Sequence, residues 1–334
     1  MNQTALRVGV IGLGKMGQRH CRVYSTLRRS QLTAVCDIDR SLASAVAQQY
    51  GAEAFDSADA LLEHVDGVSI ATPTQLHFAL ASECLTRGVH ALVEKPLTET
   101  VDQAQALCAL AQSSRATIQV GHIERFNPTF LELKNTLESL GILAIEFRRL
   151  SPLAGSNVDV DVISDLMIHD LDLLHELLGE DPTSLAAHGL VVLGRGIDHA
   201  SAQLGFAKGT LATLTASRVT EQKVRSVEVT ARGAYVVADL LAKTISLHRH
   251  TSGEYLSQNH RGVKYRQEGI VERIHVPALE PLLAELQRFV DGILDGKASA
   301  VPAEDGLRAL QWADRVRQSV QSHRLEPWAS YPTD

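Results

Sequence analysis

The chain has 334 residues, of which 45% are hydrophobic and 21% charged, and its formal net charge is −7. This composition excludes a disordered chain, and a length above 300 residues favours two domains over one. The acidic balance, without a long basic run, argues against non-specific nucleic-acid binding, which depends on clustered Lys and Arg.

The sequence shows no pattern for export or membrane insertion. Its first apolar strand is expected from Leu6, which leaves no room for a signal peptide. No apolar run approaches the ~20 residues that span a bilayer. The cysteines and histidines have neither metal-ligand nor disulfide-type spacing. We therefore expect a cytoplasmic protein that holds no metal.

Residues 6–121 alternate short aliphatic runs with helix-like stretches, the latter around 15–28, 40–50, 75–87 and 100–113. The expected strands are Leu6–Ile11, Leu32–Cys36, Gly67–Ala71, His90–Val93 and Thr117–Val120. Continuous aliphatic runs are typical of parallel strands buried on both faces. The pattern predicts a Rossmann domain over residues 1–121, with a doubly wound parallel sheet and an α/β class.

The alternation of short strands and helices ends after Gly121. Helices are expected at 128–140, 162–178, 280–295 and 303–321, with the last one free to pack back on the first domain. Strand candidates are Ile142–Leu150, Leu185–Leu193, Ala200–Phe206, Thr210–Ser217, Ser226–Ala231, Tyr235–Asp239 and Thr244–His248. Consecutive strands predict a second, α+β domain over 122–334 with an open, largely antiparallel sheet. Since an apolar open face in water would favour aggregation, we expect a homo-oligomer, a dimer or tetramer.

The first strand leads into a glycine-rich turn within the segment Val8-Gly-Val-Ile-Gly-Leu-Gly-Lys-Met-Gly17. Lys15 and Met16 lie between the last two glycines of this segment. In a dinucleotide fingerprint, Gly12 permits the tight turn, Gly14 lets the pyrophosphate approach the backbone, and Gly17 lets helix and strand pack closely. The following helix would direct its N–H groups at the phosphates. These five residues are the expected core of a cofactor site.

Asp37 ends the second strand, where a carboxylate can accept hydrogen bonds from the adenosine ribose and repel a 2′-phosphate. Its position favours NAD over NADP. Arg40 weakens that preference, because a guanidinium can hold a 2′-phosphate.

Two later strand ends should border the nicotinamide half of the cofactor. Thr72 closes the strand at Gly67–Ala71, and His77 stands on the next helix. Glu94 and Lys95 end the strand that starts at His90, so both are expected at the cofactor, and the Lys95 ammonium looks catalytic.

These motifs occur in one order, and the set includes Ala-Thr-Pro-Thr-x-x-His77, Glu94-Lys95-Pro96 and Asp165-x-x-x-His169. The chain resembles the glucose–fructose oxidoreductase/inositol dehydrogenase (Gfo/Idh/MocA) family over nearly its whole length. That resemblance implies catalytic roles for Lys95, Asp165 and His169. Asp165 and His169 are four residues apart, so on a helix they share one face, where a carboxylate can orient an imidazole for proton abstraction. The resemblance leaves open whether Lys95 or His169 transfers the proton, and whether the cofactor leaves after each turnover.

The segment Gly121-His-Ile-Glu-Arg-Phe-Asn-Pro128 is similar to that of the family's nucleotide-sugar branch, which oxidises the 3-hydroxyl of UDP-N-acetylglucosamine. Arg125 is a candidate for the cofactor or the sugar, and Arg149 and Arg218 are candidates for a diphosphate. Two alternatives stay open: a dehydrogenase of a free polyol such as inositol, and a non-catalytic dinucleotide-binding regulator.

Overall fold

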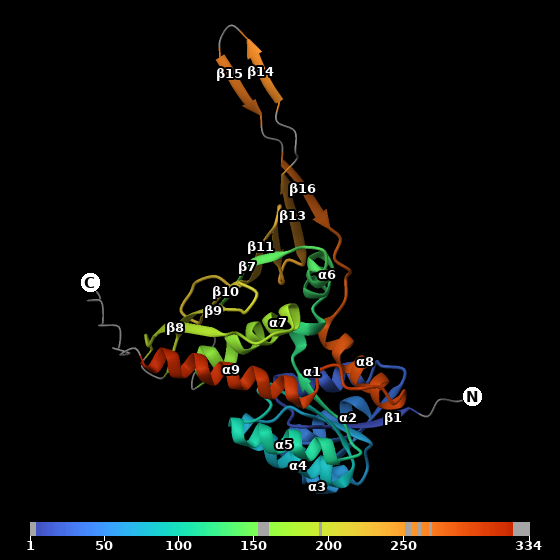
Figure 1. The fold of residues 1–334 in the computed structure, drawn as a ribbon. Helices are drawn as coiled ribbons and strands as arrows, with labels where there is room; N and C mark the ends of the chain where they lie inside the picture. The colour runs from blue at the N-terminus through green and yellow to red at the C-terminus, as the bar shows by residue number, and fades with distance from the viewer. Residues whose placement is uncertain are drawn as a thin grey trace, which may run out of the picture. The chain divides into compact units, whose positions relative to one another are not determined.

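The computed structural model describes residues 5–152, 160–193, 196–250, 255–259, 262–266 and 269–322. The chain divides into two compact units (Figure 1), residues 1–126 with 279–312 and residues 127–278 with 313–334. The sequence pattern had placed the division after Gly121. The difference arises because a later helix, 281–294, packs on the core of the first unit.

The first unit is built on a six-stranded parallel sheet in the order β3-β2-β1-β4-β5-β6. Its strands are β1 (Leu6–Ile11), β2 (Ser30–Cys36), β3 (Glu53–Phe55), β4 (Gly67–Ile70), β5 (His90–Glu94) and β6 (Ile118–Gly121). The order reverses at β1 and β4, and this reversal is where open α/β sheets bind dinucleotides, at the carboxyl ends of the strands. The short strand β3 and the helix after it were not expected from the sequence.

Helices cover both faces of this sheet. They are α1 (Lys15–Tyr24), α2 (Arg40–Tyr50), α3 (Ala58–Leu62), α4 (His77–Arg87), α5 (Val101–Ser113), α8 (Pro281–Leu294) and the first part of α9 (Ala303–Ser322). One apolar core joins α1, α2 and α8 to the sheet, and a second joins α3, α4, α5 and α9. The aliphatic strands are thus buried on both sides, as their sequences predict.

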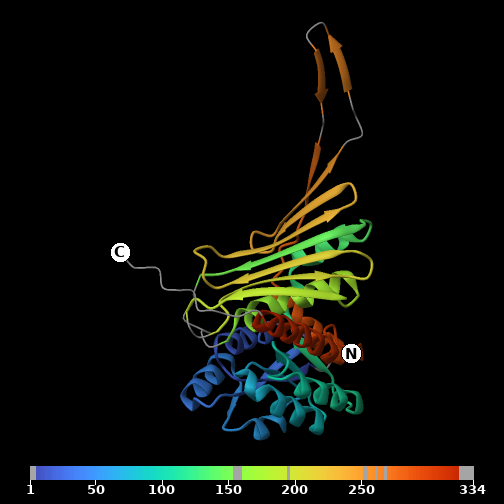
Figure 2. The ribbon, with the colours of Figure 1, turned by 60° about the vertical axis from the view of Figure 1, so that its left-hand side comes forward.

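The second unit contains an eight-stranded sheet in the order β16-β13-β12-β11-β7-β10-β9-β8, in which only β7 and β10 pair in parallel. Its strands are β7 (Ile142–Leu150), β8 (Ser184–Leu190), β9 (His199–Gly205), β10 (Leu211–Ser217), β11 (Val224–Ala231), β12 (Ala234–Asp239), β13 (Thr244–His250) and β16 (Gly269–Ile274). The strands lie side by side in Figure 2, where the green β7 stands within the sheet among the yellow-green, yellow and orange strands. A separate two-stranded ladder joins β14 (Tyr255–Asn259) and β15 (Gly262–Arg266). The predicted α+β architecture is confirmed.

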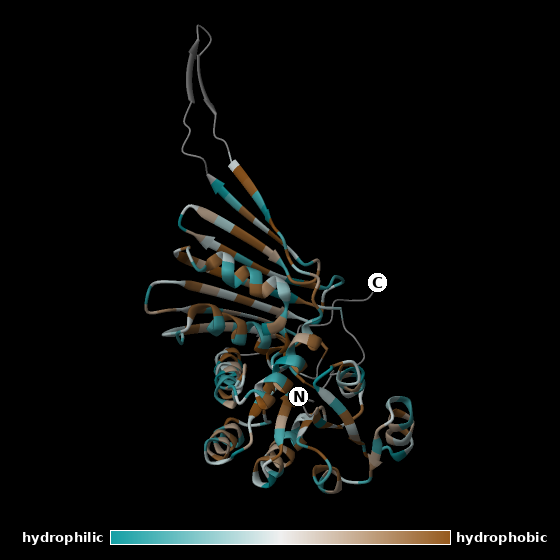
Figure 3. Cartoon of the chain, turned by 90° about the vertical axis from the view of Figure 1, so that its right-hand side faces the viewer, coloured by the Kyte–Doolittle hydropathy of each residue, from teal (hydrophilic) through white to brown (hydrophobic). Residues whose placement is uncertain are grey.

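One face of the second sheet is buried and the other is open. Burial alternates along β10 and β11, and Figure 3 shows strands on which the hydropathy colour changes from residue to residue. The helices of this unit are α6 (Pro128–Leu137), α7 (Ile168–Leu178) and the second part of α9. The open face carries mostly polar side chains, with Leu211 and Tyr235 exposed among them. The open face is therefore less apolar than the oligomer argument assumed.

Within the described part of the chain, no helix is both long and apolar enough to span a membrane.

Candidate functional site

The glycine turn after β1 has the geometry that a dinucleotide fingerprint requires. Gly12 has φ +87°, a conformation that L side chains rarely adopt, and a Cβ there would lie 2.7 Å from the carbonyl oxygen of Ala71. A Cβ on Gly17 would lie 1.8 Å from the carbonyl oxygen of Gly12. Both positions therefore exclude any side chain, and α1 packs directly against the turn.

Gly14 differs from these two glycines, because a Cβ there would meet no atom within 4 Å. Gly14 is the N-cap of α1 and, like Lys15, it is exposed, while Met16 is half-buried. No side chain caps the helix, and its first turn contains no acidic residue. The open space and the uncapped N–H groups suit a bound phosphate.

Asp37 lies beside this turn at the end of β2. Its Oδ2 accepts a hydrogen bond from the Leu13 amide at 2.6 Å, and its Oδ1 accepts one from the Asp39 amide at 2.9 Å. The carboxylate is held next to the fingerprint, where an adenosine ribose would lie. Arg40 pairs with Asp56 at 3.3 Å, and both side chains are highly exposed.

Thr72 and His77 stand after β4. The Thr72 hydroxyl is buried and has no hydrogen-bond partner among the described residues. His77 is also buried, and its ring nitrogens face two carbonyl oxygens, that of Pro96 at 2.9 Å and that of Thr72 at 3.0 Å. His77 thereby links the turns after β4 and β5, and its contact with a cofactor stays a prediction.

Glu94 and Lys95 follow β5 as expected, and the Lys95–Pro96 peptide bond is cis. The Glu94 Oε1 lies 3.0 Å from the His20 Nε2, and its Oε2 accepts a hydrogen bond from the Lys95 amide at 3.3 Å. Burial would raise the pKa of the Glu94 carboxyl, but the hydrogen bond and charge of His20 and the charge of Lys95 lower it below its ordinary value.

Together these residues fit a dinucleotide. The glycine turn leaves space at Gly14, the start of α1 offers uncapped N–H groups, and Thr72 presents an orphaned hydroxyl. These features belong to one edge of one sheet, the carboxyl end of its parallel strands. The cofactor-binding residues expected from the sequence between Gly12 and Lys95 all lie along this edge.

Arg125 lies in the turn Ile123–Phe126, after β6, and is 8% exposed. Its Nη1 donates a hydrogen bond to the Asp305 Oδ2 of α9 at 2.8 Å, and Asp305 also accepts one from Arg308. This buried ion pair ties α9 to the end of the parallel sheet. The cofactor or substrate contact expected of Arg125 stays a prediction.

Asp165 and His169 belong to the second unit and stand at the start of one continuous helical segment. A π-helical turn over Ile163–Met167 contains Asp165, and α7 begins at Ile168, directly before His169. Both side chains are half-buried. The predicted helix is therefore present, but its first turn is wider than an α-helix, and such turns are frequent at functional sites.

An acidic residue anchors this turn. The Asp161 Oδ1 accepts hydrogen bonds from the Ile163 amide at 2.9 Å and the Ser164 amide at 2.8 Å. Its Oδ2 accepts a hydrogen bond from the Arg317 Nε of α9 at 3.0 Å. The start of the helix that carries Asp165 is thus fixed by residues about 150 positions away in sequence.

Arg149 and Arg218, the candidates for a diphosphate, are both buried against carboxylates. The Arg149 Nε and Nη2 donate to the Asp170 Oδ1 at 2.9 and 2.6 Å. The Arg218 Nε lies 3.4 Å from the Asp198 Oδ1, and its Nη2 donates to the Val160 carbonyl oxygen. These contacts favour structural roles, and a role in diphosphate binding stays a prediction.

Two buried residues of the site's surroundings were missed from the sequence. His20 and Glu285 are both 0% exposed. The signal for His20 was a polar residue three positions after Gly17 on the buried face of α1. Glu285 interrupts the apolar stripe of Leu282, Leu286 and Phe289 on α8, and a charged residue in such a stripe marks a special environment.

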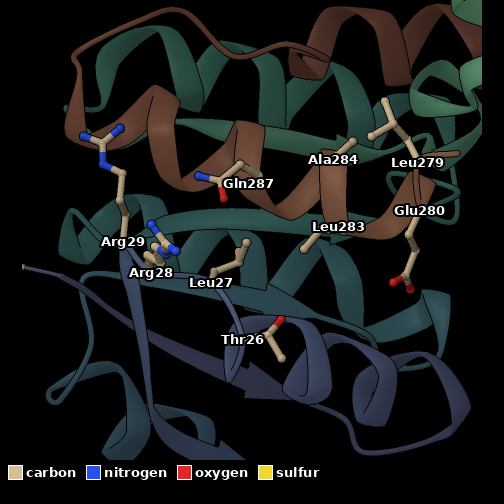
Figure 4. Close-up of a pocket in the computed structure, with 9 residues that line it drawn as sticks. All are labelled: Thr26, Leu27, Arg28, Arg29, Leu279, Glu280, Leu283, Ala284 and Gln287. Atoms are coloured by element: carbon tan, nitrogen blue, oxygen red, sulfur yellow. The ribbon is translucent and has the colours of Figure 1, made fainter. Parts of the chain in front are cut away.

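A pocket of about 550 Å³ lies elsewhere on the first unit, between the segment after α1 and helix α8 (Figure 4). The residues that line it include Leu27, Leu279 and Leu283 together with the charged Arg28 and Glu280. Arg29 immediately precedes β2, so the pocket borders the amino ends of the strands, away from the glycine turn. It is not the cofactor site. Among the described residues, no group of three or more His, Cys, Asp and Glu side chains could hold a metal ion.

Comparisons with known proteins agree with this geometry. Residues 6–122 match the family model described as "Oxidoreductase family, NAD-binding Rossmann fold", and residues 161–328 match "Oxidoreductase family, C-terminal alpha/beta domain". Together the two matches cover most of the chain.

Two curated relatives are dehydrogenases by name. The chain is 35% identical to UDP-N-acetylglucosamine 3-dehydrogenase of Acidithiobacillus ferrooxidans over 95% of this chain and 98% of that protein. It is 28% identical to an inositol 2-dehydrogenase of Rhizobium meliloti over 96% and 98% of the two chains.

Solved structures give the same result. The structure of the Acidithiobacillus ferrooxidans UDP-N-acetylglucosamine 3-dehydrogenase has a TM-score of 0.85 at 34% identity, covering 95% of this chain and 98% of that chain. The scyllo-inositol dehydrogenase of Lactobacillus casei with bound NAD(H) and scyllo-inositol shares the fold, with a TM-score of 0.78 at 20% identity, covering 96% and 98% of the two chains. The chain therefore belongs to the Gfo/Idh/MocA family and is an oxidoreductase that acts on CH–OH groups.

Proposed function

We propose that the protein oxidises the 3-hydroxyl of UDP-N-acetylglucosamine to a ketone with NAD as the hydride acceptor. The observation that carries this proposal is the similarity to a UDP-N-acetylglucosamine 3-dehydrogenase, 35% identical along nearly the full length of both chains. Inositol dehydrogenases that match over comparable lengths include four that are 26–29% identical to the chain. Lys95, Asp165 and His169 stand at the family's motif positions.

In this proposal the cofactor is held at the carboxyl edge of the parallel sheet. The N–H groups at the start of α1 bind the pyrophosphate beside Gly14, and Thr72 offers its hydroxyl. Asp37 accepts hydrogen bonds from the adenosine ribose and repels a 2′-phosphate, which favours NAD. The bound cofactor supplies the acceptor for the substrate's hydride. Arg40 still weighs against this preference, because its ion pair with Asp56 is highly exposed and its guanidinium could hold a 2′-phosphate.

The protein's own side chains handle the hydroxyl proton. His169 takes the proton from the hydroxyl oxygen as the hydride leaves the carbon that bears this hydroxyl, and Asp165 orients the imidazole. Lys95 hydrogen-bonds the substrate oxygen and stabilises the negative charge that develops on it. An ammonium beside an oxidised nicotinamide is also able to release a proton, so the pH profiles of Lys95 and His169 variants must decide which group transfers it.

The test is a substrate panel with purified protein and NAD, comparing UDP-N-acetylglucosamine with myo-inositol and reading the absorbance of NADH. We expect reduction with the sugar nucleotide and little with the polyol. A second series adds a 2-oxo acid as an acceptor, which detects turnover when the cofactor stays bound. Reduction with myo-inositol alone would replace this proposal with the inositol-type reaction. Tight NAD binding without turnover of either compound would favour a regulator or a substrate outside the panel.

A further inference from the structure

His20 is buried inside the first unit and reaches the strand that carries the expected catalytic lysine. It lies on α1, three residues after Gly17, and is 0% exposed. Its Nε2 is 3.0 Å from the Oε1 of Glu94, the last residue of β5. One helix therefore joins the phosphate-binding turn, at its start, to the Glu94–Lys95 segment, at its middle.

Glu94 is fixed on three sides. His20 contacts Oε1, and the Lys95 amide donates a hydrogen bond to Oε2 at 3.3 Å. Gly121 is the neighbour of Glu94 on β6, and a Cβ on Gly121 would lie 3.1 Å from both Cδ and Oε2 of Glu94. The carboxylate thus packs against Gly121, which has no side chain, and lies between His20 and the backbone of Lys95.

The groups around Glu94 decide its charge. Besides His20 and Lys95, a second carboxyl, Glu285 on α8, interacts with Glu94, and burial followed by the charge of Glu94 raises the pKa of Glu285 well above its ordinary value. Tyr24 on α1 hydrogen-bonds Ser69 at 2.8 Å, and burial raises its pKa. The pKa of Glu94 is thus lowered while that of Glu285 is raised, and His20 gives Glu94 a side-chain hydrogen bond.

We propose that His20 is a positioning residue for Lys95, because its hydrogen bond holds the Glu94 carboxylate against the Lys95 amide and so fixes the backbone that carries the ammonium. The inference rests on the proposed function for the role of Lys95. Without a donor at position 20, the Glu94 carboxylate, whose side chain is 13% exposed, has one partner fewer, and it binds a proton at higher pH. The protonated carboxyl accepts a weaker hydrogen bond from the Lys95 amide, and it no longer attracts the Lys95 ammonium.

The experiment compares two variants of the full chain, His20→Gln and His20→Leu. The two side chains are similar in size and neither titrates, but only Gln offers an N–H at the place of Nε2. We expect His20→Gln to keep most of the wild-type turnover. In its plot of kcat/KM against pH, the decrease on the acid side (the acid limb) should occur at the same pH as in the wild type. In His20→Leu, turnover should fall about ten- to a hundredfold, as for a misplaced catalytic group, and the acid limb should move to higher pH. NAD affinity should differ little between the two.

Tyr24→Phe is the matched control, since it also removes a hydrogen bond from a buried residue of α1, that with Ser69. It should lower the thermal unfolding temperature without moving the acid limb. The inference would be overturned if the pH dependence of kcat/KM had the same shape in His20→Leu and His20→Gln and differed only in amplitude. A structural defect alone would lower the rate without shifting the pH at which it falls.

A second readout needs no substrate. With a donor present, the lowered pKa of Glu94 stabilises the fold above pH 4.5, the ordinary value, and this contribution is lost as the pH falls through the folded value. Without the donor, stability instead falls as the pH rises. The unfolding temperatures of His20→Gln and His20→Leu should therefore diverge between about pH 5 and pH 8.

A gap in unfolding temperature that does not change with pH would overturn the inference. If no substrate of the panel reduces NAD, the proposed function fails. The divergence in unfolding temperature still tests the link from His20 to Glu94, so the two failures are distinguishable.

Discussion

Lys95 combines two properties that a catalytic lysine of this class needs. It follows directly after a buried strand, at the edge of the sheet where the glycine turn and Asp37 also lie. Its amide is tied to the carboxylate of Glu94, which is itself held by His20. The backbone of the lysine is thus held at the end of a rigid strand, as the proposed contact of its ammonium with the substrate oxygen requires.

Lys95→Ala should leave the dissociation constant of NAD within a few-fold of the wild-type value, because the pyrophosphate contacts come from the glycine turn. Turnover should fall by at least ~10², since the group that stabilises the alkoxide is gone. Equilibrium NAD titration and steady-state kinetics on the same preparation measure both quantities. Turnover equal to that of the wild type would exclude the proposed role.

Asp37→Ser should shift the cofactor preference toward NADP. The carboxylate that would repel a 2′-phosphate disappears, while a hydroxyl stays near the Leu13 amide. The measurement is the ratio of kcat/KM for NAD and NADP. Asp39→Asn is the matched control, because Asp39 caps α2 and its amide replacement can still accept those hydrogen bonds. An unaltered ratio in Asp37→Ser would mean that another residue sets the preference.

At the scale of elements, α8 shows why the first unit needs a late segment of the chain. Leu282, Leu286, Phe289 and Val290 are buried and join the core that α1 and α2 form with the sheet. Glu285 lies among them with both carboxyl oxygens buried and without a hydrogen-bond partner in the described structure. Because a neutral acid is much less costly to bury than a carboxylate, burial, followed by the charge of Glu94, raises the pKa of Glu285 well above its ordinary value.

Glu285→Gln should therefore raise stability at alkaline pH. The pKa of Glu285 is higher in the folded protein than its ordinary value of 4.5, so the wild type loses stability as the pH rises from about 4.5 toward the folded value. Gln keeps the shape but does not titrate. Thermal unfolding should show a gain of several degrees at pH 8 that shrinks toward pH 4.5. Glu280→Gln, at the exposed start of α8, should show no such trend. A gain independent of pH would contradict the assignment.

At the scale of the whole molecule, the second sheet presents an open face with polar and a few apolar residues. Glu146, Arg148 and Thr213 lie on it beside the half-buried Val237. The expectation of a homo-oligomer stays a prediction, and a second copy of the sheet is the proposed partner of this face. Aggregation is a weaker reason for it than the sequence suggested, because the face is not predominantly apolar.

Val237→Lys tests that expectation. Val237 alternates with the buried Val236 and Ala238, so its side chain lies on the open face of β12. A lysine there should leave the fold intact but place a charge within the proposed interface. Light scattering coupled to size exclusion should show an oligomer for the wild type and a smaller species for the variant. A monomeric wild type, or an unchanged mass with Val237→Lys, would reject this face as the interface.

The sequence by itself determined the strands and helices whose patterns are local. Continuous aliphatic runs predicted the parallel strands, and the three glycines, whose spacing follows from one turn after β1, predicted the tight turn that the structure shows at Gly12 and Gly17. It placed β1, α2 and β7 at their observed bounds. The motif order also led to the correct family and to an oxidoreductase.

Only the tertiary structure decided which side chains become partners. Arg125 meets Asp305, and Arg149 meets Asp170, through folds of the chain that no local pattern reveals. The same holds for His20 against Glu94 and for α8 within the first unit. The physical reason is that burial and charge act through space, so whether a polar residue is a ligand, an ion pair or a neutral acid depends on neighbours far away in sequence.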